Sequence, residues 1–158
     1  MTRACCGPAA KPHGHGAAAA DDFAALTRIQ PANSYALLWL HIARRRAGQD
    51  DKQEFKANAA KLDQGRWPWP LVAFYLGNES ADAVFAAATS TATGGVQTRI
   101  CDAEFYVAID RLANADQREA RRLFEAAVKD CSVHNRDHAF AAMELARLNA
   151  LATSRANP

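Results

Sequence analysis

The clearest pattern of apolar positions along the chain lies between Cys101 and Cys131. Apolar residues recur there at the spacing of one helix face, in two sets. The first set is Phe105, Val107, Ala108, Ile109 and Leu112, and the second is Ala120, Leu123, Phe124, Ala127 and Val128. Asn114-Ala115-Asp116 separates the sets, and Asp116-x-x-Glu119 is typical of a helix start. The pattern predicts two amphipathic helices folded back on each other.

The same periodicity predicts three more helices upstream. An alanine-rich helix is expected over residues 17–30. A second is expected over 34–48, with Gly48 in the left-handed conformation that often ends a helix. Asp51-x-x-Glu54 then opens a third helix, which we expect to run through Leu62.

A proline-rich connector and two short helices occupy the middle of the chain. Trp67-Pro68-Trp69-Pro70 is rigid because proline fixes φ, and we interpret its tryptophans as packing residues rather than ligand contacts. A helix over 71–76 should end at Gly77, where we expect two helices to come close. Ser80 is the expected cap of the next helix, and the Gly/Thr-rich residues 89–99 are expected to form a loop.

The last predicted helix begins after Asn135 and runs through Leu151. Its apolar residues form a broad face: Phe140, Met143, Leu145, Leu148 and Leu151. A terminal helix of this kind can cover the end of a helical array while its outer face stays polar.

Three of the predicted helices share a pattern of large, aromatic, apolar and small residues. It occurs as LWLH at 38–41, FYLG at 74–77 and FYVA at 105–108, in steps of 36 and 31 residues. His41 departs from the small residue, and we therefore expect loose packing in the first repeat unit. The steps are close to the roughly 34-residue period of tetratricopeptide repeats.

The hairpin between the two cysteines resembles the tetratricopeptide consensus. Its small positions hold Ala108, Ala120 and Ala127, and its large apolar position holds Phe124. It departs from the consensus at Arg111, where an aromatic residue is usual, and at Ser132, where proline is frequent. The resemblance implies an all-α, tetratricopeptide-like solenoid of about three helical hairpins with a C-terminal capping helix.

The expected domain limits follow from the same alignment. Residues 1–16 have no periodicity and are expected to be a disordered N-terminal segment, 17–152 the repeat domain, and 153–158 a disordered C-terminal tail. Phe23 and Pro31 match the second helix of a repeat. We therefore expect that the natural chain begins on half a unit or that its start lies further upstream.

Composition and charge narrow the class of partner. The chain has 158 residues, is 49 % hydrophobic with much alanine, and has few runs typical of strands. Its 19 basic and 17 acidic residues give a formal net charge of +2, which is no reason to expect a nucleic acid. No apolar stretch approaches the roughly 20 residues of a membrane-spanning helix.

The four cysteines form two groups, Cys5-Cys6 and Cys101 with Cys131. Neither group has the spacing of a structural zinc site. The start of the first helix and the end of the second lie at the same end of an antiparallel hairpin, so Cys101 and Cys131 are a candidate disulfide. The alternative is two unrelated small residues at helix ends. A disulfide would favour an oxidising compartment.

The sequence contains no nucleophile elbow, Walker loop, dinucleotide-binding glycine pattern or HExxH motif. His13-x-His15 lies in a segment without order to fix a metal, and we interpret His134 and His138 as surface histidines. No carboxylate pair stands out as a catalytic dyad. We therefore predict a non-enzymatic protein without cofactor or metal.

Residues 31–148 resemble a bacterial subgroup of tetratricopeptide-repeat proteins that includes the NlpI-type lipoproteins. The resemblance is carried by WLHIARRRAG, the Trp-Pro connector, FYLG, Arg99–Tyr106 and ELARL at 144–148. Members are non-enzymatic adaptors that bind proteases or cell-wall hydrolases, and many are exported. The resemblance and the cysteines imply a periplasmic location, whereas the given start without a signal peptide would imply the cytoplasm.

The leading prediction is a scaffold that binds a protein or peptide partner. Stacked hairpins curve so that their first helices line a concave groove. In the repeat alignment the groove positions are Tyr35, Leu38, Ile42, Arg45, Leu71, Phe74, Asn78, Asp102, Phe105, Ile109 and Leu112. We expect at least half of them to pack between repeats instead. The alternatives are a structural module of the cell envelope that forms homodimers through its half repeat, and an accessory subunit of an enzyme or a metal-dependent hydrolase.

Overall fold

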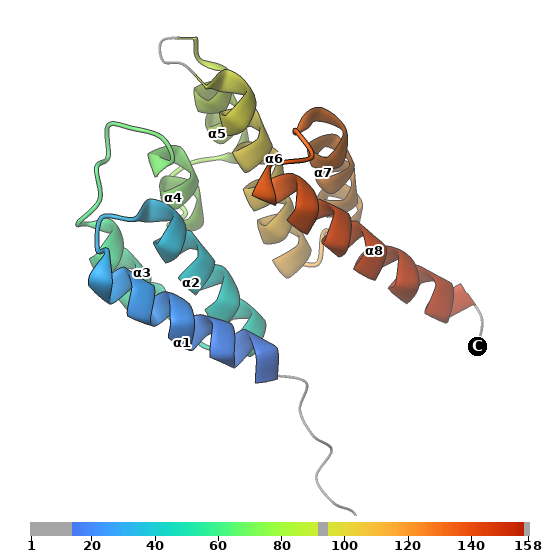
Figure 1. Ribbon diagram of the computed structural model, residues 1–158, viewed down its shortest axis with the longest axis horizontal. Coiled ribbons are helices and arrows are strands. Elements are labelled where there is room, and N and C mark those ends of the chain that lie inside the picture. Colours follow the sequence, from blue (N-terminus) through green and yellow to red (C-terminus); the bar gives the residue numbers. More distant parts are fainter. Residues whose placement is uncertain (1–13, 92–94, 157–158) are drawn as a thin grey trace, which may run out of the picture. The chain divides into compact units, whose positions relative to one another are not determined.

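The computed structural model of the chain describes residues 14–91 and 95–156 (Figure 1). Its helices are α1 (Gly14–Ile29), α2 (Ser34–Ala47), α3 (Lys52–Ala59), α4 (Trp69–Tyr75), α5 (Ala81–Thr89), α6 (Val96–Ala113), α7 (Gln117–Asp130) and α8 (Arg136–Ala156). The described ranges contain no strand. The predicted all-α class is confirmed, and the arrangement of the hairpins as a tetratricopeptide solenoid stays a prediction.

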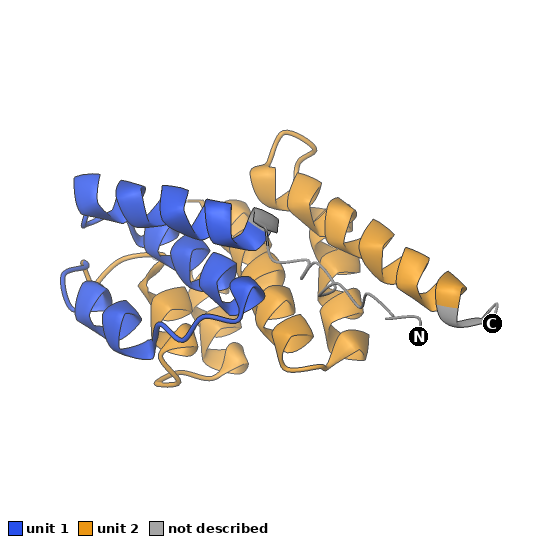
Figure 2. Cartoon of the chain, turned by 90° about the horizontal axis from the view of Figure 1, so that it is seen from below, with its two compact units in different colours: residues 1–62 blue, residues 63–158 orange. Residues whose placement is uncertain are grey.

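The chain divides into two compact units, which Figure 2 colours separately. Unit 1 is Met1–Leu62 and contains α1, α2 and α3, and unit 2 is Asp63–Pro158 and contains α4 to α8. The sequence predicts one repeat domain over 17–152. The boundary between the units lies just ahead of the Trp67-Pro68 connector.

Unit 1 is built on the contact between α1 and α2. Ala20, Leu40 and Ala43 form a buried cluster, against which Ala19, Phe23 and Ala24 pack. A Cβ atom on Gly16 would lie 3.5 Å from the backbone nitrogen of Ala47, so the two helices approach closely there. Small side chains on α1 are what allow this approach.

Unit 2 is organised around α6. Every residue from Cys101 to Ile109 is buried, because α4, α5, α7 and α8 all contact this helix. The ring of Phe105 lies 6.2 Å from that of Phe124 on α7 and 6.1 Å from that of Phe140 on α8, measured between centroids. Since neighbours surround α6, its polar residues Asp102 and Glu104 are buried as well.

Local sequence sets most helix ends. Side-chain oxygens of Asn33, Ser80 and Asp116 cap α2, α5 and α7 by accepting hydrogen bonds from backbone N–H groups three residues on. Gly48, with φ of 72°, ends α2 as predicted. Gly77 has φ of 77°, but a Cβ atom there would meet nothing within 4 Å. The expected close helix approach at Gly77 is therefore wrong, and the backbone conformation alone favours glycine.

The third helix of unit 1 differs from its prediction. α3 ends at Ala59 rather than Leu62, and Asp51 makes no side-chain cap bond. The Asp51 carboxylate instead meets Nδ1 of His41 at 2.9 Å. His41 is only 7 % exposed, and its ring lies 4.5 Å from that of Phe55. His41 itself is therefore closely packed, whereas loose packing of its repeat unit stays a prediction.

Three helices of unit 2 and one of unit 1 are longer than predicted. α4 begins at Trp69, two residues before the helix expected over 71–76, so it includes the second half of the Trp-Pro connector. α6 begins at Val96, so the expected loop over 89–99 is shorter, and residues 92–94 within it lie outside the described residues. α8 continues through Ala156, which corrects the tail expected from residue 153. The segment predicted as disordered, 1–16, lies outside the described residues up to residue 13, and α1 already begins at Gly14.

Candidate functional site

Unit 2 contains an open hollow of about 670 Å³ beside the start of α6. The connector before α4 with the first turn of α4, the end of α5 and the beginning of α6 line it. Its residues are Gln64, Gly65, Arg66, Trp67, Pro70, Ala87, Ser90, Gly95, Thr98 and Arg99. Ligand pockets in proteins have volumes of roughly 300–1,000 Å³, so the hollow is large enough for a small ligand or a short chain segment.

The walls of the hollow combine apolar surface with hydrogen-bonding groups. Trp67 and Pro70 supply ring surfaces. Arg99 is buried, and its guanidinium donates hydrogen bonds to the backbone carbonyls of Ala88, at 3.2 Å, and of Ser90. These bonds hold the end of α5 against the first turns of α6, so this part of the wall is built by tertiary contacts.

A line of hydrogen-bonding groups leads from the hollow into the core. Nε1 of Trp67 donates to Oδ2 of Asp102 on α6, at 2.7 Å. Asp102 in turn is in hydrogen-bond contact with Asp137 in the first turn of α8. Both carboxyl groups are buried, with Asp137 only 1 % exposed. The wall of the hollow is thus connected to α8 through two acidic side chains.

The environment of Asp137 favours its neutral form. Burial, the hydrogen bond with Asp102 and the negative charge of Asp102 raise the pKa of Asp137 to about 7, against the opposing effect of Arg136. Oδ1 of Asp137 lies 3.7 Å from Nε of Arg136 and makes no hydrogen bond among the described residues. Burial also raises the pKa of the neighbouring Tyr106 well above its ordinary value.

A second buried acid lies on α6, near α7. Burial and the negative charge of Asp130 raise the pKa of Glu104 to about 7, while Arg122 acts in the opposite direction. Its Oε2 atom is buried and has no hydrogen-bond partner within the described ranges. Unit 2 therefore holds two carboxyl groups that are neutral in part at pH 7.

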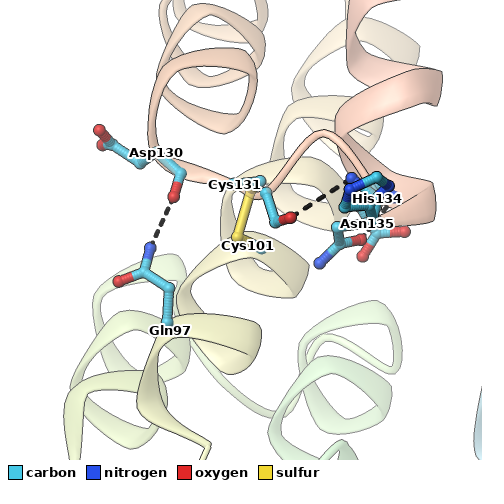
Figure 3. The surroundings of a disulfide bond; sticks show 8 residues. Gln97, Cys101, Asp130, Cys131, His134 and Asn135 are labelled. Carbon is cyan, nitrogen blue, oxygen red and sulfur yellow. Dashed lines mark hydrogen bonds between the residues drawn. A yellow bond between two sulfur atoms is a disulfide. The ribbon is translucent and has the colours of Figure 1, made fainter.

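Figure 3 shows the disulfide between Cys101 of α6 and Cys131, which directly follows α7. The Cα atoms are 5.6 Å apart, within the range of disulfides in proteins. Nε2 of Gln97 also donates to the backbone carbonyl of Asp130, at 2.8 Å (Figure 3). The structure thus pairs the two cysteines that the sequence predicts, at the open end of the α6–α7 hairpin.

The predicted groove residues take different places. Six are buried in the core of their unit: Leu38, Ile42, Leu71, Asp102, Phe105 and Ile109. Four are half-buried, namely Tyr35, Arg45, Phe74 and Leu112, and Asn78 is exposed. The first four in sequence belong to unit 1 and the other seven to unit 2. None of the eleven lines the hollow, so the hollow is a different surface from the predicted groove.

Sequence reasoning missed both the hollow and the carboxyl pair. The hollow is lined by the Trp-Pro connector and the 89–99 segment, which the sequence marks only as a connector and a loop. The repeat alignment assigns Asp102 to the groove, whereas no sequence pattern singles out Asp137. The residues are 35 positions apart and become neighbours only when α8 folds back on α6.

No family model matches this chain. Membership of the tetratricopeptide family therefore stays a prediction from the resemblance. Across the described ranges, no three histidine, cysteine, aspartate or glutamate side chains gather closely enough to hold a metal ion. Within those ranges there is also no helix whose length and apolar character would let it cross a membrane.

Proposed function

We propose that the chain is a non-enzymatic scaffold that binds an extended segment of a partner protein, and that this segment lies in the hollow of unit 2. The observation that carries the proposal is the composition of the walls. Trp67 and Pro70 offer surfaces on which side chains can pack, and polar groups stand beside them for the main chain of a bound segment.

Two further properties of the wall support this function. Three separate segments meet at the hollow, and Arg99 holds two of them together. A site held in this way keeps its shape before binding, which lowers the entropy lost when a ligand is ordered. The volume of about 670 Å³ suits a few residues of a peptide.

Selection of peptides from a random display library on the immobilised protein tests the proposal. Thr98 is exposed on the wall, so Thr98→Trp should fill the hollow without disturbing the core. Glu125→Trp is the matched control, because Glu125 is exposed on α7 and does not line the hollow. We expect selected peptides to bind Thr98→Trp at least about tenfold more weakly and Glu125→Trp unchanged. Failure to select any peptide, or equal binding by all three proteins, would refute the proposal.

Homodimerisation is the second candidate, and it has a different basis. Met143 and Leu151 of α8 are 66 % and 44 % exposed, although both are large and apolar. Such residues on a terminal helix can pack against a second copy. Light scattering after size exclusion distinguishes the candidates, because a chain that stays monomeric at high concentration excludes a stable homodimer.

A further inference from the structure

Three groups from three elements meet in the interior of unit 2. The indole N–H of Trp67, in the connector, donates to Asp102 of α6, and Asp102 contacts Asp137 of α8. The relative exposures of Asp102 and Asp137 are 3 % and 1 %. The carboxyl pair is therefore removed from water and joins α8 to the element that carries Trp67.

The contact between the two carboxyl groups needs a proton. An ionised carboxylate only accepts hydrogen bonds, so two ionised groups cannot bond to each other. Two adjacent negative charges in a buried site would also repel each other and would have lost their hydration. Since Asp102 already accepts the N–H of Trp67, the proton is best placed on Asp137, which then donates to Asp102.

We propose that the Asp102–Asp137 pair is a proton-operated latch, in which one shared proton holds the first turn of α8 against α6 and its loss releases that turn and the side chain of Trp67. The charged and titratable groups that act on Asp137 are Asp102 and Tyr106 of α6 and Arg136 of its own helix. The hydroxyl group of Tyr75, on α4, donates to the backbone carbonyl of Tyr106 at 2.8 Å and is the nearest titratable group that α4 contributes.

The direction of the pH response follows from these groups. Arg136 and the position of Asp137 at a helix N-terminus favour the ionised form, but burial and Asp102 outweigh them and raise the pKa from 3.8 to about 7. The folded protein thus binds a proton that the unfolded chain releases above about pH 4. The latch contributes fully to stability below that pH, and its contribution is lost as the pH rises through 7.

The latch has a consequence for the hollow because Trp67 belongs to both. Alkaline pH should loosen this wall and weaken the binding of a peptide. That consequence rests on the proposed function, whereas the latch does not. The experiment below contains no peptide, so its failure and the failure of peptide selection are separate results.

The test follows Trp67 as the only tryptophan, in a Trp39→Phe/Trp69→Phe protein, by fluorescence from pH 5 to pH 9. We expect one reversible transition with a midpoint near pH 7. Asp137→Asn should abolish it, because an amide can still donate to Asp102 but cannot ionise. The absence of a transition in the parent, or the same transition in Asp137→Asn, would overturn the proposal.

Two controls exclude other titrating groups. Imidazole side chains titrate in the same interval, so the transition must persist in His134→Gln/His138→Gln. It must also persist in Glu104→Gln, which removes the other acid with a raised pKa. A transition lost in either control would belong to those residues and would overturn the proposal.

A measurement on the unsubstituted protein decides the question if Asp137→Asn does not fold. The side-chain carboxyl carbons of aspartate are labelled with ¹³C, and their chemical shifts are followed against pH. An aspartate that titrates near pH 7 supports the latch. If every aspartate titrates below about pH 5.5, the pair does not hold a proton at neutral pH and the proposal is wrong.

Discussion

Reduction of the Cys101–Cys131 disulfide should strongly destabilise unit 2. The two residues are 30 positions apart and their bond closes a loop over α6 and α7. For a loop of this size, the chain-entropy model gives a loss of about 3.6 kcal/mol in the free energy of unfolding at 25 °C. That is a large part of the roughly 5–15 kcal/mol by which small domains are stable.

The assay is urea denaturation with and without reductant, on a protein in which Cys5 and Cys6 are replaced by serine. Only one intramolecular pair can then form. Trp39→Phe removes the tryptophan of unit 1, so that Trp67 and Trp69 report on unit 2 alone. The reduced and oxidised forms have the same side chains, and the buried cysteines create no cavity in either.

Two controls accompany the urea denaturation: one establishes that the disulfide is present, and the other gives the effect of a single hydrogen bond for comparison. Trypsin should release residues 100–111 linked to residues 130–136 from the oxidised protein, which establishes the bond by mass spectrometry. Gln97→Ala removes the hydrogen bond to Asp130 at the same end of the hairpin and should cost only about 1 kcal/mol or less. With the bond established, a difference below about 1 kcal/mol between the two redox forms would refute the reasoning. It would mean that the reduced, unfolded chain already keeps α6 and α7 together.

Three further changes are expected to have measurable effects on urea denaturation. Gly77→Val should lower the free energy of unfolding by about 1–2 kcal/mol because valine is strained at φ of 77°; the loss should be smaller for Gly65→Val, which lacks a positive φ, and equal losses would contradict this cause. Glu104→Gln should raise the denaturation midpoint at pH 8 more than at pH 5, since the pKa of Glu104 is raised from 4.5 to about 7 and the stabilising neutral form is lost as the pH rises through 7. Equal effects at both pH values would show that Glu104 is ionised throughout. Asp51→Ala should destabilise unit 1 by about 1–3 kcal/mol, because His41 loses its buried acceptor; an unchanged Trp39 fluorescence transition would contradict that.

Features that depend on near neighbours in the sequence were predictable. Ser80 and Asp116 cap helices through bonds that span three residues, and Gly48 ends a helix through its own backbone conformation. The disulfide could also be predicted, because two cysteines at the ends of one hairpin are brought together by its antiparallel geometry alone. Each of these predictions uses information that one or two helices contain.

Predictions failed where a tertiary partner competed with a local one. Asp51 has the spacing of a capping residue, but its carboxylate binds His41, ten positions earlier, and makes no cap bond to its own helix. α6 begins earlier than its polar first turn suggested, since Arg99 finds acceptors on α5 and is buried among them. In both places the packing of helices decides which hydrogen-bond partner a side chain finds, and the periodicity of apolar residues does not predict that packing.

The hollow and the carboxyl pair could not be found from sequence for a similar reason. The connector at 67–70 reads as a spacer because its prolines explain its rigidity, and nothing local places the Trp67 indole beside Asp102. The sequence also gives no sign that Asp102 is a buried residue, since the repeat alignment assigns it to a groove while the structure buries it. Whether the hairpins form a solenoid groove stays a prediction.

The disulfide and the carboxyl pair involve adjacent residues, Cys101 and Asp102, so both interactions hold the same turn of α6. Cys131 is held to that turn covalently, and only five residues separate Cys131 from Asp137. While the bond is intact, loss of the shared proton frees only the first turn of α8, because the short segment after Cys131 keeps Asp137 near Asp102 and the effective concentration of one carboxyl group near the other stays high. Reduction removes that limit, and the rest of α8 can then also leave α6 once the pair ionises. Linkage is reciprocal, so the shared proton must in turn stabilise the disulfide against reduction. Unit 2 should therefore be weakest where the medium is both reducing and alkaline, and the effect of the two conditions together should exceed the sum of their separate effects.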